Sequence, residues 1–142
     1  MRLELTRRAD YAIRAMLAVN SAEDRARPNV RNIAADQRIP PEILPRIMSD
    51  LVRAGLVAST AGRSGGYRLA RPGSAISLLD VIEAIEGDGR RRSCILRQGP
   101  CSLDGVCDVH LLFAQAQEAM LGMLSTAKLD EVTRQAGEAA AS

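Results

Sequence analysis

Two short helical patterns separated by a tight turn constrain the fold of this chain more than any other feature. Asn29 can cap the first of these helices, which is expected to end near Asp36. The sequence Ile39-Pro40-Pro41 then forces an extended turn, because a residue that precedes proline is disfavoured in the helical region. The second helix is expected from Glu42 to Ala54, with its large apolar residues on one face. This arrangement predicts a helix-turn-helix.

A glycine-rich hairpin is expected directly after these helices. Residues 56–59 and 67–69 have the pattern of two short strands, and Gly62-Arg63-Ser64-Gly65-Gly66 can form the turn between them. A phosphate-cradling loop is disfavoured, because no Gly-Lys-Ser/Thr follows and the loop returns into a strand. The hairpin is therefore predicted to be the wing of a winged helix. In such a fold the preceding helix enters the DNA major groove, and the wing reaches the backbone or the minor groove.

Charge is unevenly distributed along the 142 residues. The formal net charge is only +2, but residues 1–71 carry 13 arginines against 7 acidic residues, whereas residues 72–142 carry 6 basic against 10 acidic residues. The basic half is the expected face for a polyanion. We expect three DNA-binding residues in it: Glu42 and Arg46 on the major-groove helix, and Arg63 at the wing tip.

Helices are also expected on both sides of this motif. The first spans about Thr6–Ser21, and Ser77 can cap another. A long helix at Asp108–Leu124 carries apolar residues on more than one face. A helix this apolar must be covered on several sides, and in so small a chain the natural cover is a second subunit.

All three cysteines and the only histidine lie close together. Cys94, Cys101, Cys107 and His110 are spaced C-x6-C-x5-C-x2-H, with turn-forming residues between them. Thiolate and imidazole ligands suit zinc or an iron-sulfur cluster, whereas magnesium and calcium require oxygen ligands. Structural zinc sites usually pair cysteines across two to four residues, so the first gap favours a cluster, which accepts ligands from a wider loop. A metal-free thiol redox switch stays open as an alternative.

The expected fold class is mainly α with a small β-hairpin wing, that is, a winged helix-turn-helix joined to a long dimerisation helix. Residues 129–134 are expected to form a short turn and residues 137–142 a frayed end. The predicted domains are a winged-helix DNA-binding domain (1–87), a cluster-binding loop (88–107), a dimerisation helix with a C-terminal turn (108–135) and a tail (136–142).

No targeting or membrane-spanning segment is expected. The N-terminus leads into a charged amphipathic helix, and no apolar run approaches the ~20 residues that a bilayer requires. A cytoplasmic protein without a membrane partner is predicted. A reducing cytosol also suits three free thiolates that hold a metal.

Four segments carry a resemblance that covers residues 1 to about 135. They are Met1-Arg2-Leu3, Asp10–Leu17, Leu51–Val57 and Gly65–Ala70. Together with the three-cysteine loop, these segments resemble the iron-sulfur winged-helix repressors, the IscR/NsrR-like family. The resemblance implies a non-enzymatic, homodimeric transcriptional regulator of a palindromic operator in double-stranded DNA. It also implies that a [2Fe-2S] or [4Fe-4S] cluster senses redox stress, nitric oxide or cluster supply and thereby sets DNA affinity.

Two features depart from the family pattern. The first cysteine gap is one residue longer than usual, and Pro45 lies within the major-groove helix, where members commonly carry a polar residue. The alternative functions are a zinc-bearing or thiol-switch regulator of the same fold and a small electron-transfer protein. The latter is disfavoured, because an electron carrier has no use for a helix-turn-helix and a wing.

The resemblance leaves two candidates for the fourth cluster ligand. His110 follows Cys107 by three residues, so both can share one face of a helical turn, and the cluster-assembly members of the family favour it. Asp10 is the alternative, because it resembles the carboxylate ligand of the nitric-oxide sensors and could reach the cluster from the partner subunit. His110 is the preferred ligand.

Overall fold

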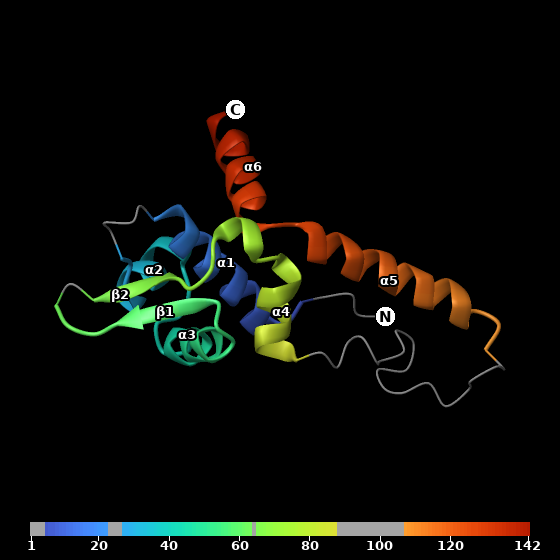
Figure 1. Ribbon diagram of the computed structural model, residues 1–142, viewed down its shortest axis with the longest axis horizontal. Helices are drawn as coiled ribbons and strands as arrows, with labels where there is room; N and C mark the ends of the chain where they lie inside the picture. The colour runs from blue at the N-terminus through green and yellow to red at the C-terminus, as the bar shows by residue number, and fades with distance from the viewer. Residues whose placement is uncertain (1–4, 23–26, 64, 88–106) are drawn as a thin grey trace.

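Helices form the body of this protein, and a small antiparallel hairpin lies at one edge of it (Figure 1). The computed structural model describes residues 5–22, 27–63, 65–87 and 107–142. Within these ranges the elements are α1 (Arg7–Ser21), α2 (Val30–Gln37), α3 (Leu44–Arg53), β1 (Val57–Thr60), β2 (Gly66–Leu69), the short 3-10 helix η1 (Gly73–Ala75), α4 (Leu78–Glu86), α5 (His110–Thr126) and α6 (Leu129–Ala141). The expected mainly α fold with a hairpin wing is confirmed.

Side-chain caps define the start of the first two helices. Thr6 Oγ1 accepts a hydrogen bond from the Ala9 N–H at 3.1 Å and caps α1. Asn29 and Asn32 exchange side-chain-to-backbone hydrogen bonds, which form a capping box at the start of α2. Both helices therefore begin where the sequence pattern predicted.

Helix α3 begins at Leu44, two residues later than expected, because residues 41–43 form a turn. Pro45 consequently lies in the first turn of the helix. Backbone N–H groups in a first turn have no intrahelical acceptor, so a proline there removes no helical hydrogen bond. Pro45 is thus compatible with an intact α3.

The turn between α2 and α3 has a left-handed backbone at Arg38, with φ 53° and ψ 47°. The Arg38 N–H donates to the Ala35 carbonyl at 3.4 Å, and the Ile39 N–H donates to the Ala34 carbonyl at 3.0 Å. These two bonds close the C-terminus of α2 in a Schellman motif. Ile39 is then buried, so hydrogen bonding and packing both fix the turn of the helix-turn-helix.

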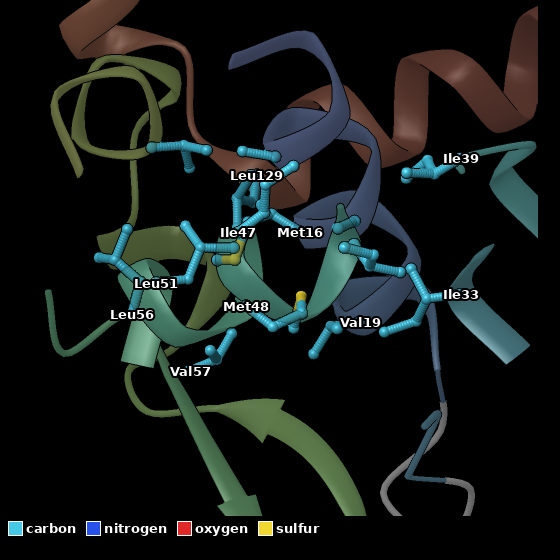
Figure 2. Packing of buried hydrophobic residues seen from close by; sticks show 14 of the residues in the cluster. Met16, Val19, Ile33, Ile39, Ile47, Met48, Leu51, Leu56, Val57 and Leu129 are labelled. Carbon is cyan, nitrogen blue, oxygen red and sulfur yellow. The ribbon is translucent and has the colours of Figure 1, made fainter. Parts of the chain in front are cut away.

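Aliphatic side chains and methionines form the core between α1, α2, α3, α4 and the hairpin (Figure 2). The chain has no tryptophan and one phenylalanine, so branched and sulfur-containing residues fill this space. Residues with no exposed surface include Met16, Ile33, Leu44, Ile47, Met48, Leu51, Ile76 and Leu129. Four of these come from α3, and each buried side chain of this size contributes about 1.5–3 kcal/mol. Packing therefore fixes α3 against the rest of the fold.

The hairpin forms in the expected place and is attached to the segment before α2. Its register pairs Val57 with Leu69 and Thr60 with Gly66. The Tyr67 N–H donates to the Pro28 carbonyl at 2.9 Å, and a Cβ at Gly66 would collide with the backbone of residues 27–28. The start of β2, next to the turn of the wing, therefore needs glycine at this close approach, and the wing is tied to the segment that leads into the helix-turn-helix.

The connection between α5 and α6 is joined to the segment that precedes α4. The Leu78 N–H donates to the Ala127 carbonyl at 2.9 Å, and the Leu129 N–H donates to the Ile76 carbonyl at 3.0 Å. Leu129 is fully buried in the same core as the helix-turn-helix. The C-terminal end of α5 is therefore attached to the DNA-binding body.

The turn expected at 129–134 and the frayed end expected at 137–142 are both wrong, since one helix, α6, spans Leu129–Ala141. Asp130 and Glu131 in its first turn interact favourably with the helix dipole, and alanines favour helix in its last turns. The Asn20 amide of α1 donates to Thr133 Oγ1 at 2.9 Å. The contact with α1 and the buried Leu129 therefore stabilise α6 over a segment whose helix propensity alone did not predict a helix.

Helix α5 extends away from the body of the molecule (Figure 1). None of its residues is buried, and Leu111, Leu112 and Met123 are 68%, 65% and 75% exposed. Its C-terminal part contacts α4, where Leu79 and Ile82 lie near Met120 and Leu124. Within the described ranges, the helices lack the combination of length and apolar character that crossing a bilayer demands.

Candidate nucleic-acid interface and metal-ligand turn

The face of α3 that points away from the core is basic. Arg46 and Arg53 lie on it with side chains 76% and 73% exposed. Because Leu44, Ile47 and Leu51 hold the opposite face in the core, these arginines cannot turn inward without unpacking the helix. The expected exposure of Arg46 is therefore observed, and α3 presents guanidinium groups to solvent.

Asp50 of α3 is paired with three arginines, two from α3 and one from α1. Its Oδ2 is 2.6 Å from Arg8 Nη2 of α1, and its Oδ1 is 3.3 Å from Arg53 Nη1 and 3.7 Å from Arg46 Nε. The Asp50 side chain is only 11% exposed. We call these four residues the Asp50 cluster. The i,i+4 and i,i+3 spacings within α3 were readable from the sequence, but the contribution of Arg8 was not, because it depends on how α1 crosses α3.

The two other predicted DNA-binding residues lie on either side of α3 along the chain. Glu42 is exposed in the turn just before the helix and not within it. Arg63 is exposed in the turn between β1 and β2, next to Gly62, whose φ of 102° favours glycine. Both positions leave the side chains available to a ligand outside the protein.

Two of the four predicted cluster ligands lie in the described residues. Cys107 is a half-buried free thiol in the turn that leads into α5, and His110 is the exposed first residue of that helix. The His110 N–H donates to the Cys107 carbonyl at 3.1 Å, so one turn contains both. Cys94 and Cys101 lie outside the described residues. The thiol and imidazole of this turn are a donor pair that an iron-sulfur cluster can accept.

Asp10, the alternative fourth ligand, is paired with an arginine. Arg14 Nη2 lies 2.6 Å from Asp10 Oδ2, and Arg14 Nε donates to Asp10 Oδ1 at 3.3 Å. Arg14 also stacks over the Tyr11 ring at 5.7 Å and donates to the Gln37 carbonyl at 3.5 Å. Both carboxylate oxygens are therefore engaged, and a metal would have to displace a bidentate arginine.

A helix-turn-helix followed by a hairpin, with an exposed basic third helix, defines a winged-helix DNA-binding protein. Comparison with known families makes the class narrower. Residues 5–135 match the family model of Rrf2, described as an iron-dependent transcriptional regulator. The chain belongs to the Rrf2 family, and it is a transcriptional regulator and not an enzyme.

Individual relatives agree with this membership. The chain is 31% identical over 130 residues to the transcriptional regulator IscR of Photorhabdus laumondii, covering 92% of this chain and 79% of that protein. A Mycobacterium tuberculosis protein with the name of an HTH-type regulator is 41% identical over 85 residues, or 60% of this chain. That match spans about half, 53%, of the mycobacterial protein. The structure of CymR, the global cysteine regulator of Bacillus subtilis, superposes with a TM-score of 0.79 at 21% identity, covering 94% of this chain and 98% of CymR.

Proposed function

We propose that this chain is a homodimeric repressor that binds a palindromic DNA operator with an affinity set by an iron-sulfur cluster. The observation that carries the proposal is the presence, in one Rrf2-family chain, of a winged helix and of the Cys107–His110 turn at the start of α5. The winged helix offers a DNA-reading surface, and the turn offers thiolate and imidazole donors.

In this proposal α3 enters the major groove with Glu42 and Arg46 near its leading end, and Arg63 reaches the backbone or the minor groove. Glutamate can accept a hydrogen bond from the cytosine amino group, and arginine can donate two to guanine. The exposure of these side chains at the start of α3 and at the tip of the wing supports the assignment. The hydrogen bond from the Tyr67 N–H to the Pro28 carbonyl limits movement of the wing relative to the segment that leads into α2.

Cys94, Cys101, Cys107 and His110 are the proposed cluster ligands, with Asp10 as the alternative to His110. The chemistry of the donor set fits, because thiolates are the usual ligands of iron-sulfur clusters and histidine can replace one of them. When bound, the cluster would supply a redox-active centre whose integrity responds to oxidants, nitric oxide or iron and sulfide supply. The chain's own contribution is to bring Cys107 and His110 into one turn at the tip of α5.

A homodimer is proposed because α5 leaves a long apolar surface uncovered. Leu111, Leu112 and Met123 are each exposed by about two thirds or more, although burial of such side chains is strongly favourable. A second copy of α5 would cover this surface in a two-fold arrangement and present two copies of α3 to two half-sites.

Anaerobic purification followed by operator binding tests the proposal. We expect visible charge-transfer absorption, stoichiometric iron and sulfide, and tighter binding of the cluster-loaded dimer to a DNA fragment from the region upstream of its own gene. Zinc without colour would instead identify a zinc-bearing regulator of the same fold. Metal-free protein whose DNA affinity responds to thiol oxidation would identify a thiol switch. A reversible redox wave without DNA affinity would contradict the regulator proposal altogether.

A further inference from the structure

The Asp50 cluster contains more positive charge and more hydrogen-bond donors than its own contacts use. Three guanidinium groups surround one carboxylate, so the cluster carries a net charge of +2. A guanidinium has five N–H donors, and Asp50 engages one nitrogen of each arginine. The side chains of Arg8, Arg46 and Arg53 are 49%, 76% and 73% exposed, so their remaining donors can reach a ligand from solvent.

An anionic ligand with several oxygen acceptors would match this surface. Guanidinium groups bind phosphate with paired, planar hydrogen bonds. Arg46 Nε and Arg53 Nη1 contact the same oxygen of Asp50, at 3.7 and 3.3 Å, and Arg8 Nη2 contacts the other oxygen, so the three guanidinium groups converge on one carboxylate. The cluster therefore concentrates guanidinium donors at one place on the surface, as the binding of a backbone phosphate requires.

The low exposure of Asp50 fits such a ligand. A carboxylate on a DNA-facing surface repels phosphate, yet the Asp50 side chain is only 11% exposed and is paired with three arginines. Its Oδ1 orients the two arginines of α3, and its Oδ2 orients Arg8 of α1. Asp50 thus joins two helices and restrains three flexible side chains at one place.

We propose that Arg8 and Arg53 form a binding site for the DNA phosphate backbone next to the base-reading Arg46, and that Asp50 is the residue that positions all three. This inference rests on the proposed DNA-binding function and adds Arg8, Arg53 and Asp50 to the residues that serve it. Fixing a long side chain in one conformation on association costs free energy. Because Asp50 already restrains these arginines in the free protein, less conformational freedom is lost when DNA binds.

Substitution Asp50→Asn separates positioning from simple electrostatics, because the two predict opposite changes. Loss of a negative charge alone would tighten binding to every duplex. Loss of positioning weakens operator binding by roughly 2- to 12-fold for each arginine that must then be ordered on association. We expect Asp50→Asn to weaken operator binding and to leave binding to a scrambled duplex equal or tighter. The ratio of the two affinities should therefore fall.

Arg8→Gln and Arg53→Gln test the phosphate contacts directly. Each should weaken operator binding several-fold and flatten the slope of log affinity against log salt by about 0.9, the value for one phosphate neutralised. Arg134→Gln is the matched control, because it removes the same charge from the exposed face of α6, which projects from the side of the body opposite α3 (Figure 1). It should leave the slope unchanged.

The measurement uses holo protein purified anaerobically, with an operator selected from a random-sequence library and thermal unfolding of every variant. If Arg8→Gln and Arg53→Gln match Arg134→Gln in salt slope, the cluster does not contact DNA and the inference is wrong, whatever their thermal stability. If Asp50→Asn tightens operator and scrambled duplex by the same factor, Asp50 is not a positioning residue. Should Asp50→Asn fail to fold, the two arginine variants still decide the phosphate contacts.

Failure of the inference can be told apart from failure of the proposed function. Wild-type protein that selects no sequence from the library would contradict the proposed function itself. If wild-type protein selects an operator and the Arg8→Gln and Arg53→Gln variants bind it with wild-type affinity, only the inference is contradicted.

Discussion

At the scale of single residues, the choice between His110 and Asp10 as fourth ligand depends on what each side chain already binds. His110 is exposed in one turn with Cys107, whereas both oxygens of Asp10 are engaged by Arg14. We expect His110→Ala to change the visible spectrum and shorten cluster lifetime, and Asp10→Ala to leave both unchanged. Anaerobic absorption spectra and decay in air measure the two effects.

Arg14→Gln is the control for that comparison, because it releases the Asp10 carboxylate without removing it. It should leave the spectrum of the wild type intact. A cluster that survives His110→Ala but is lost in Asp10→Ala would reverse the assignment and make Asp10 the ligand.

Arg63 at the tip of the wing provides a second test with a single residue. Its exposed guanidinium next to Gly62 is expected to neutralise one phosphate, so Arg63→Ala should weaken operator binding and flatten the salt slope by about 0.9. Arg134→Ala on α6 is the charge-matched control. Operator affinity that is unchanged across a salt series would exclude the wing from DNA binding.

At the scale of elements, the turn of the helix-turn-helix stores backbone strain at Arg38. A non-glycine residue in the left-handed region destabilises the folded state by about 1–2 kcal/mol. Glycine would relieve this strain, but it loses more conformational entropy on folding, which offsets part of the gain. Arg38→Gly should therefore raise the free energy of unfolding by about 0.5–1 kcal/mol, measured by urea denaturation. The same change within a helix, Arg134→Gly, should lower it by about 1 kcal/mol. Destabilisation by both would show that the Arg38 side chain contributes more than its backbone costs.

Helix α5 provides the element-scale test of dimerisation. Leu111 and Leu112 are 68% and 65% exposed, and their burial in a dimer would contribute about 1.5–3 kcal/mol per side chain. Leu111→Glu removes one such side chain from each subunit, so it should weaken dimerisation by at least about 3 kcal/mol, which raises the dissociation constant roughly a hundredfold. Analytical ultracentrifugation measures this change, with Gln135→Glu on the exposed surface of α6 as control. A variant that remains dimeric at wild-type concentrations would place the interface elsewhere.

At the scale of the whole molecule, contacts join the ends of α4 and α5 to the DNA-binding surface. The Thr6 N–H at the start of α1 donates to Glu86 Oε1 at the end of α4, at 3.1 Å. In the first turn of α1, Arg8 is paired with Asp50 of α3. The connection between α5 and α6 is hydrogen-bonded to Ile76 and Leu78, just before and at the start of α4. A change in the angle of α5 or α4 can therefore reach α3 through packed and hydrogen-bonded elements.

This connection underlies the prediction about the switch. Coupling between two sites is typically worth 1–3 kcal/mol, so holo and apo dimers should differ by roughly 5- to 150-fold on a palindromic operator, with holo tighter. Cys101→Ala should behave as permanently apo. Anaerobic gel shifts with holo, apo and Cys101→Ala proteins measure both effects. Equal affinities for all three would reduce the cluster to a structural element without a sensing role.

The sequence alone determined those features that depend on local chemistry. Thr6, Asn29 and Ser77 cap helices because their side chains accept hydrogen bonds from nearby backbone N–H groups, and all three caps form as predicted. The glycine-rich turn and the flanking strands specified the hairpin in the same local way. The family resemblance, which rests on short segments read in order, is likewise confirmed by the match over residues 5–135.

Only the tertiary structure decided the features that join distant parts of the chain. Helix α6 was missed because its stability comes from Leu129 in the core and from Asn20 of α1, which no local pattern reveals. The pairing of Arg8 with Asp50 depends on the crossing of α1 and α3, 42 residues apart in sequence. Local hydrogen bonds are encoded by neighbours along the chain, whereas these contacts exist only after packing has fixed the helices against one another.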